Sequence, residues 1–168
     1  ASWSPPAYMK YNQGTTGHSP GDNSLMPEFY DDFGHYVVYF IEQFRRQVGV
    51  DLMAVCLSNE PLFDQPYGSC SYTYTEMRDM LAVALPIIAA ECSDVRVMMP
   101  DDTFFPNRYE SWLASALANP TVDSHVDIVS VHGYHSSTGI GARDAEWTDL
   151  ASQAAAAGKQ LWQTEQSE

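Results

Sequence analysis

Four apolar runs recur along this chain at nearly regular intervals, and a polar or charged residue follows each of them. The runs end near residues 57, 100, 132 and 164, so the successive steps are 43, 32 and 32 residues. Between the runs, apolar residues recur with the period of an amphipathic helix. Apolar runs without charges are typical of strands buried on both faces of a parallel sheet. The repeated order of strand, loop and helix therefore predicts an α/β fold built from βα units.

A short fragment at residues 1–3 adds a fifth strand to this pattern. A closed (β/α)8 barrel needs eight strands and about 250 residues. With about five parallel strands and four helices, residues 1–168 are predicted to form the central part of a single domain, a partial (β/α)8 TIM barrel whose N- and C-terminal strands are missing. The predicted strands cover 1–3, 52–57, 95–100, 126–131 and 160–164, and the predicted helices cover 27–48, 75–90, 108–118 and 145–157.

Glycine and proline mark the ends of several predicted elements. Gly49 ends the first helix. Pro86 is predicted to kink or break the second helix, because proline removes a backbone hydrogen bond and clashes with the preceding turn. Pro100 is predicted to end the strand that precedes it. The pair Asn119-Pro120 is predicted to stop the third helix.

The composition excludes several classes of protein. The chain has 8 Lys+Arg against 22 Asp+Glu, a formal charge of -14, so we expect no binding to nucleic acid or to anionic membranes. It has no run of eighteen apolar residues that could span a membrane. Its three cysteines cannot all pair within the chain, although the sequence leaves a bond between Cys70 and Cys92 open.

Two glutamates stand at the ends of predicted strands. Glu60 follows the run 52–57, and Glu165 follows the last strand, 105 residues or about three βα units later. In a barrel, strands three steps apart face each other obliquely across the mouth, so both side chains could flank one ligand. A retaining glycosidase needs two carboxyl groups about 5–5.5 Å apart. Around them, Asn59 is suited to hydrogen-bond a sugar hydroxyl, and further substrate contacts are predicted from Trp3, His132, Tyr134 and Trp162.

Four motifs follow one another along the chain: Trp3-Ser4-Pro5-Pro6-Ala7-Tyr8-Met9-Lys10, Leu57-Ser58-Asn59-Glu60-Pro61, Val131-His132-Gly133-Tyr134 and Leu161-Trp162-Gln163-Thr164-Glu165. In this order they resemble the successive signatures of glycoside hydrolase family 30, whose members are retaining β-glycosidases on (β/α)8 barrels. The resemblance implies that Glu60 ends the fourth strand as acid/base and that Glu165 ends the seventh as nucleophile. It also implies that Trp3 ends the third strand, and that His132 and Tyr134 follow the sixth.

The resemblance implies a β-linked polysaccharide or glycoside as substrate, such as xylan, a β-1,6-glucan or galactan, or glucosylceramide. We expect no cofactor and no metal, a monomer, and a secreted or extracytoplasmic location. Because strands are missing, we expect the chain to be a fragment that is inactive alone. Specificity is predicted to reside in the loops 11–26, 62–74 and 135–144.

Other interpretations stay open at this point. The chain could be a catalytically inactive carbohydrate-binding barrel, or a metal-dependent hydrolase that uses His132, His135 and Asp127. Asp101 and Asp102 also follow a predicted strand, but for them helix capping or solvation in a loop is the preferred interpretation over contact with substrate.

Overall fold

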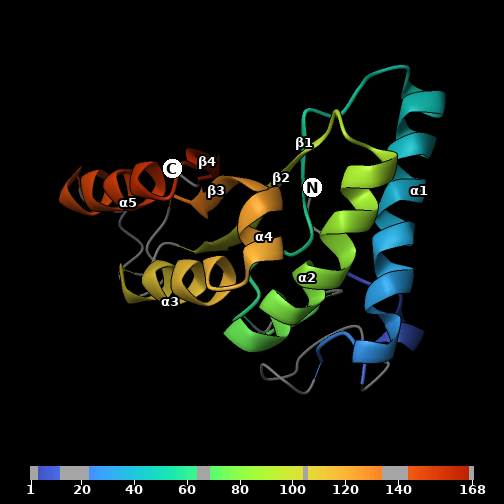
Figure 1. Ribbon diagram of the computed structural model, residues 1–168, viewed down its shortest axis with the longest axis horizontal. Coiled ribbons are helices and arrows are strands. Elements are labelled where there is room, and N and C mark those ends of the chain that lie inside the picture. The colour runs from blue at the N-terminus through green and yellow to red at the C-terminus, as the bar shows by residue number, and fades with distance from the viewer. Residues whose placement is uncertain (1–3, 12–22, 64–68, 104–105, 134–143, 167–168) are drawn as a thin grey trace.

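The computed structural model describes residues 4–11, 23–63, 69–103, 106–133 and 144–166, and within them four parallel strands form one sheet (Figure 1). The strands lie in the order of the sequence: β1 (Ala54–Cys56), β2 (Arg96–Thr103), β3 (Val126–His132) and β4 (Gln160–Glu165). The helices are α1 (Tyr30–Val48), α2 (Tyr74–Glu91), α3 (Pro106–Leu117), α4 (Pro120–His125) and α5 (Asp144–Ala156), with short 3-10 turns at Ala7–Met9 and Pro27–Phe29.

This arrangement confirms the predicted α/β class. Each strand lies beside the one before it, with helical segments in every connection, so the order never reverses as it does in doubly wound sheets. Continuous winding in one direction is the arrangement of a (β/α)8 barrel, and an open four-stranded sheet agrees with part of one. The predicted strand at 1–3 lies outside the described residues, so the structure has four of the five expected strands.

Helix α1 follows its apolar periodicity closely. Phe33, Val37 and Ile41 recur at helical spacing and are fully buried. Gly34 lies on the same face, where an added Cβ would come within 3.0 Å of the Ile87 side chain, so α1 and α2 approach closely at this point. Gly49 ends the helix in the left-handed conformation, with φ 72°, as predicted.

Helix α2 is continuous at Pro86, so the predicted break there is wrong and the predicted kink stays a prediction. The helix begins with a capping box, in which the Thr73 hydroxyl accepts from the Glu76 N–H while the Glu76 carboxylate accepts from the Thr73 N–H. It then continues through Pro86 to Glu91 without a break. Leu85 and Ile88 on either side of the proline are fully buried, and this packing holds the helix together where the backbone has lost one hydrogen bond.

The two predicted strands nearest the first glutamate also need correction. β1 is shorter than the run 52–57, and Met53 before it is 65% exposed, because β1 lies at an edge of the described sheet. β2 does not end at Pro100 but continues to Thr103. Its register with β3 shifts between Pro100 and Asp102, so Asp101 is an extra residue in the ladder, with φ 60°.

Helix α4 was not predicted. Asn119-Pro120 does stop α3, but the same pair begins the next helix. The Asn119 side chain accepts hydrogen bonds from the N–H groups of Thr121 and Val122, and Pro120 occupies the first turn, where its missing N–H has no cost.

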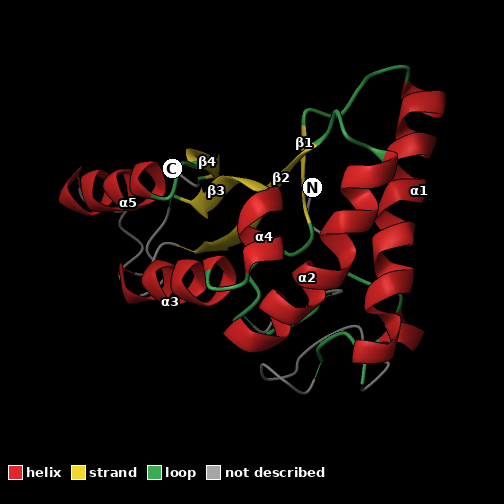
Figure 2. Ribbon diagram, viewed as in Figure 1, coloured by secondary structure: helices red, strands yellow, loops and turns green. Residues whose placement is uncertain are grey.

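Helices cover one face of the sheet, and Figure 2 shows them beside the strands. One apolar cluster joins residues of α1, α2, α3 and α4 with β1 and β2, and a second joins α3 and α5 with β3 and β4. A third cluster contains no helical residue and joins Cys56, Met98 and Ile128 with Ala54 and Trp162. All three cysteines are buried free thiols, so Cys70 and Cys92 do not pair. Among the described residues, every helix is too short or too polar to cross a membrane.

Candidate active site

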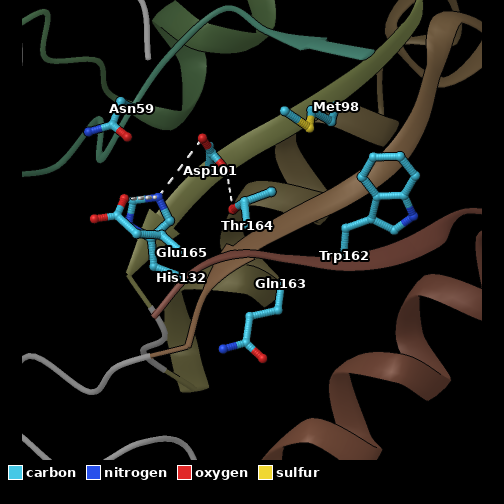
Figure 3. Close-up of a pocket in the computed structure, with 8 residues that line it drawn as sticks. All are labelled: Asn59, Met98, Asp101, His132, Trp162, Gln163, Thr164 and Glu165. Atoms are coloured by element: carbon cyan, nitrogen blue, oxygen red, sulfur yellow. Dashed lines mark hydrogen bonds and ion pairs between the residues drawn. The ribbon is translucent and has the colours of Figure 1, made fainter. Parts of the chain in front are cut away.

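His132, the last residue of β3, connects the two predicted catalytic glutamates. Its ring is almost fully buried, and its Nδ1 lies 3.0 Å from Oε1 of Glu60. Its Nε2 lies 3.2 Å from Oε2 of Glu165, at the end of β4 (Figure 3). The chain therefore brings together three residues that are separated by 72 and 33 positions in the sequence. The two carboxylates lie on opposite sides of one imidazole ring.

Glu60 belongs to a tight turn that follows β1. Its φ is 45°, its N–H donates to the Asp101 carbonyl at 2.9 Å, and its own carbonyl accepts from the Phe63 N–H at 2.9 Å. Two residues earlier, the Ser58 hydroxyl donates to the Pro100 carbonyl at 2.7 Å. These bonds attach the turn to the carboxyl end of β2. The Glu60 side chain is buried and contacts His132 from this fixed backbone.

Glu165 has a different environment. Its side chain is 54% exposed, although its carbonyl is held by the Gly133 N–H at 2.6 Å. The preceding residue, Thr164, donates its hydroxyl to Oδ1 of Asp101 at 2.5 Å. A bound molecule could therefore reach the Glu165 carboxylate from solvent, whereas the Glu60 side chain is buried.

The charge of His132 follows from its neighbours. Burial by itself lowers the pKa of His132, but the carboxylates of Asp101 and Glu60, and then the charge of Glu165, outweigh burial and raise this pKa to about 9. His132 is therefore an imidazolium at neutral pH. Only the imidazolium carries a proton on both ring nitrogens, so only this form can donate to both glutamates at once.

This protonation predicts a pH dependence of stability. The pKa of His132 rises on folding from its ordinary value of 6.5 to about 9. Its contribution, about 3 kcal/mol, is present in full below the unfolded value and is lost as pH rises through the folded value. We expect the free energy of unfolding, measured with urea, to fall between about pH 6.5 and about pH 9. A His132→Gln variant should lack most of this fall, and an equal fall in that variant would contradict the assignment.

A cavity of about 420 Å³ opens beside these groups. It is lined by Asn59, Met98, Asp101, His132, Trp162, Gln163, Thr164 and Glu165 (Figure 3). Of the predicted substrate-binding residues, Asn59, His132 and Trp162 thus lie on its wall. Trp162 also packs against the third apolar cluster, around Cys56, Met98 and Ile128, and its ring lies 4.7 Å from the Arg96 guanidinium. Trp3 and Tyr134 lie outside the described residues.

Four residues of the cavity were not predicted as site residues: Met98, Asp101, Gln163 and Thr164. The interpretation of Asp101 and Asp102 as residues solvated in a loop was wrong, since both are buried. Asp101 faces His132, with 3.9 Å between Oδ2 and Nε2. Asp102 points toward α3, where it accepts from the Trp112 indole N–H at 3.0 Å. The position of Asp101 after an apolar run is the signal that also selected Glu60.

The residues of the metal alternative do not assemble. Asp127 is the second residue of β3 and His132 the last, so about five residues of strand, or about 16 Å, separate them. The Asp127 carboxylate accepts from the Val97 N–H at 3.0 Å instead. His135 lies outside the described residues. Within the described part of the chain, no three His, Cys, Asp or Glu side chains are grouped as metal ligands would be.

The family model of the glycosyl hydrolase family 30 TIM-barrel domain matches residues 1–161. The chain belongs to glycosyl hydrolase family 30. The resemblance carried by the four motifs is therefore confirmed at the level of the family. The match includes Asn59, Glu60 and His132 and ends four residues before Glu165. A comparison with curated proteins found no match.

Solved structures extend this family 30 assignment to the fold. The family 30 subfamily 8 xylanase Xyn30A from Clostridium acetobutylicum is 28% identical at a TM-score of 0.73, over 96% of this chain and 37% of that chain. SrfJ from Salmonella typhimurium is 23% identical, with a TM-score of 0.77, over 98% and 34%. An endo-β1,6-glucanase is 22% identical, with a TM-score of 0.80, over 98% and 36%. The family 30 chain thus spans about a third of the length of these structures.

Proposed function

We propose that this family 30 protein is a retaining β-glycoside hydrolase in which Glu60 is the acid/base and Glu165 the nucleophile. The observation that carries the proposal is the contact of both carboxylates with the two nitrogens of His132. Both acids reach the ring of His132 beside the cavity that Glu165 lines, so the ends of two distant strands meet at one site, as a pair of glycosidase acids requires. The family assignment supports hydrolysis of a glycoside, and the geometry supports the choice of the two acids.

The different environments of the two glutamates support their separate roles. Glu165 lines the cavity with an exposed carboxylate, so it can attack the anomeric carbon of a bound sugar. Glu60 is buried next to Asn59; in its protonated form it would give its proton to the leaving oxygen, and as a carboxylate it would then take a proton from the attacking water. Asn59 lies on the cavity wall, where its amide can hydrogen-bond a hydroxyl of the sugar whose bond is cleaved.

A xylan-type substrate is the first to test. The xylanase that is 28% identical to this chain supports a β-linked xylose polymer. β-1,6-Glucan or galactan and glucosylceramide remain alternative substrates. Specificity is proposed to reside in the loops 11–26, 62–74 and 135–144, most of which lie outside the described residues. Trp3 and Tyr134 remain predicted sugar contacts. Four further expectations also stay predictions: that the protein is a monomer, that it is secreted, that it needs no cofactor, and that residues 1–168 alone are inactive.

The stereochemistry of the product tests the proposal. The full-length protein is incubated with a β-linked xylo-oligosaccharide or an aryl β-glycoside, and the first product is followed by proton NMR. We expect the β anomer to appear first and the α anomer only later, by mutarotation, because two displacements restore the configuration. An α product appearing first would contradict the retaining mechanism. Binding without any hydrolysis would instead indicate a catalytically inactive carbohydrate-binding barrel.

A further inference from the structure

Asp101 contacts the ends of three strands at the candidate site. On the β1 side, its carbonyl accepts from the Glu60 N–H at 2.9 Å. On the β3 side, its Oδ2 lies 3.9 Å from Nε2 of His132. On the β4 side, its Oδ1 accepts from the Thr164 hydroxyl at 2.5 Å, next to Glu165 (Figure 3). Asp101 itself lines the cavity but is only 4% exposed, and these contacts are all to groups of the protein.

The backbone at Asp101 explains how one residue can make all three contacts. Asp101 is the extra residue where the register between β2 and β3 shifts, so its position in the ladder has no partner in β3. Its φ of 60° lies in the left-handed region, which Asp and Asn adopt more readily than most residues. Such bulges re-aim a side chain and are common next to active sites. Here the bulge turns the carbonyl to the Glu60 turn and the carboxylate to His132 and Thr164.

We propose that Asp101 is a positioning residue that joins the ends of β1, β3 and β4, and so holds Glu60, His132 and Glu165 in one arrangement. This role rests on the hydrolase function proposed above. Asp101 acts through its neighbours: it anchors the Glu60 turn by its backbone, and it holds His132 and the end of β4 by its carboxylate.

The charges around His132 make the role measurable. Three carboxylates face this ring among the described residues, namely Glu60 from the turn after β1, Asp101 from β2 and Glu165 from β4. After burial, which lowers the pKa of His132, Asp101 has the largest influence on it and raises it. Removing the Asp101 charge should therefore make His132 lose its second proton at lower pH. One of the two glutamates then loses its hydrogen-bond donor.

The test uses Asp101→Asn in the full-length protein, because asparagine tolerates the left-handed backbone and still accepts from Thr164. We expect the pKa of His132, read from its imidazole NMR signals, to fall by about one pH unit. The basic limb of the kcat/KM profile should move to lower pH, and kcat should fall about tenfold with little change in KM. A His132 titration identical to that of the wild type would overturn the proposal.

Asp102→Asn is the matched control. Asp102 is the adjacent buried carboxylate, but it accepts from the Trp112 indole and the Thr103 N–H on the helix side of the sheet. We expect this variant to be less stable, with the His132 titration and the basic limb in their wild-type positions. If Asp102→Asn shifted both by as much as Asp101→Asn, a general loss of packing would explain the effect and the positioning role would be wrong.

Thr164 tests the β4 contact without changing any charge. Thr164→Val removes the hydroxyl that donates to Asp101, whereas Thr164→Ser keeps it. We expect Val to lower kcat by about tenfold with the His132 titration unchanged, and Ser to restore most of kcat. Equal kcat values for Thr164→Val and Thr164→Ser would refute the proposal that Asp101 positions the end of β4. The NMR titration of His132 needs no turnover, so it can be measured even if the protein has no hydrolase activity. In that case, a shift of the His132 titration in Asp101→Asn would support the positioning role of Asp101, while the missing activity would refute the proposed function.

Discussion

Replacing Glu165 with alanine should lower the turnover of an aryl β-glycoside by at least about 10⁴-fold, since removal of a nucleophile abolishes the covalent step. The exposed position of this carboxylate beside the cavity gives a second expectation. Azide can occupy the space of the missing side chain and attack from the same face, which yields the α-glycosyl azide. The rate is followed by release of the aryl group, and the product is identified by NMR.

A surface glutamate supplies the control for this variant. Glu91 pairs with His35 on the surface, and His35 belongs to α1. Glu91→Ala should therefore keep wild-type turnover and should not respond to azide. If Glu165→Ala also kept wild-type turnover, Glu165 would not be the nucleophile, and the contact between His132 and Glu165 would have only a structural meaning.

Replacing Glu60 with alanine should have a different signature. Loss of an acid/base costs about 10²–10⁴-fold, and the loss should be greatest for substrates with poor leaving groups, which need protonation. For a good leaving group, the covalent intermediate should accumulate and azide should accelerate its breakdown to the β-glycosyl azide. The measurement is kcat and kcat/KM across a series of aryl β-glycosides of different leaving-group pKa.

The same series contains the control for Glu60. Asn59→Ala changes the neighbouring residue, which lies on the cavity wall without an ionisable group. This variant should lower kcat/KM by a similar factor for every substrate in the series, because it removes a hydrogen bond to the sugar but leaves the proton donor in place. A Glu60→Ala variant with the same uniform loss, and without the β-azide, would remove the acid/base assignment. Because Glu60 is buried, circular dichroism of both variants checks that the fold is intact.

Much of the fold could be predicted because burial leaves a periodic pattern. The four-residue spacing of Phe33, Val37 and Ile41, close to one helical turn, identified α1, and Gly49 marked its end. The prolines were harder to interpret, since one residue type has opposite meanings in different positions. Pro86 lies within α2, which tertiary packing maintains, whereas Pro120 follows the end of α3 and begins α4.

The structure brings the predicted residues Glu60, His132 and Glu165 together, and the cavity beside them also has lining residues that were not predicted. Glu60, His132 and Glu165 follow apolar runs, so the parallel sheet alone predicts that they meet at one edge. Their placement on the two nitrogens of one ring depends on side-chain geometry that no spacing contains. Asp101 was misinterpreted because Pro100 was taken as the end of a strand. A bulge depends on the pairing of two distant strands, and it has no local sequence signal here.

The charged groups around His132 also set the electrostatic potential of the cavity. Among the described residues around it, three acidic side chains face a single imidazolium, so negative charge exceeds positive charge there even when Glu60 carries the proton that it gives to the leaving group. A sugar ring that loses its leaving group develops positive charge as an oxocarbenium-like species, and fixed negative charge nearby lowers the energy of that state. A uronic acid at the same position would meet repulsion. For the hydrolase proposed above, we therefore expect faster cleavage next to an uncharged sugar than next to a uronic acid.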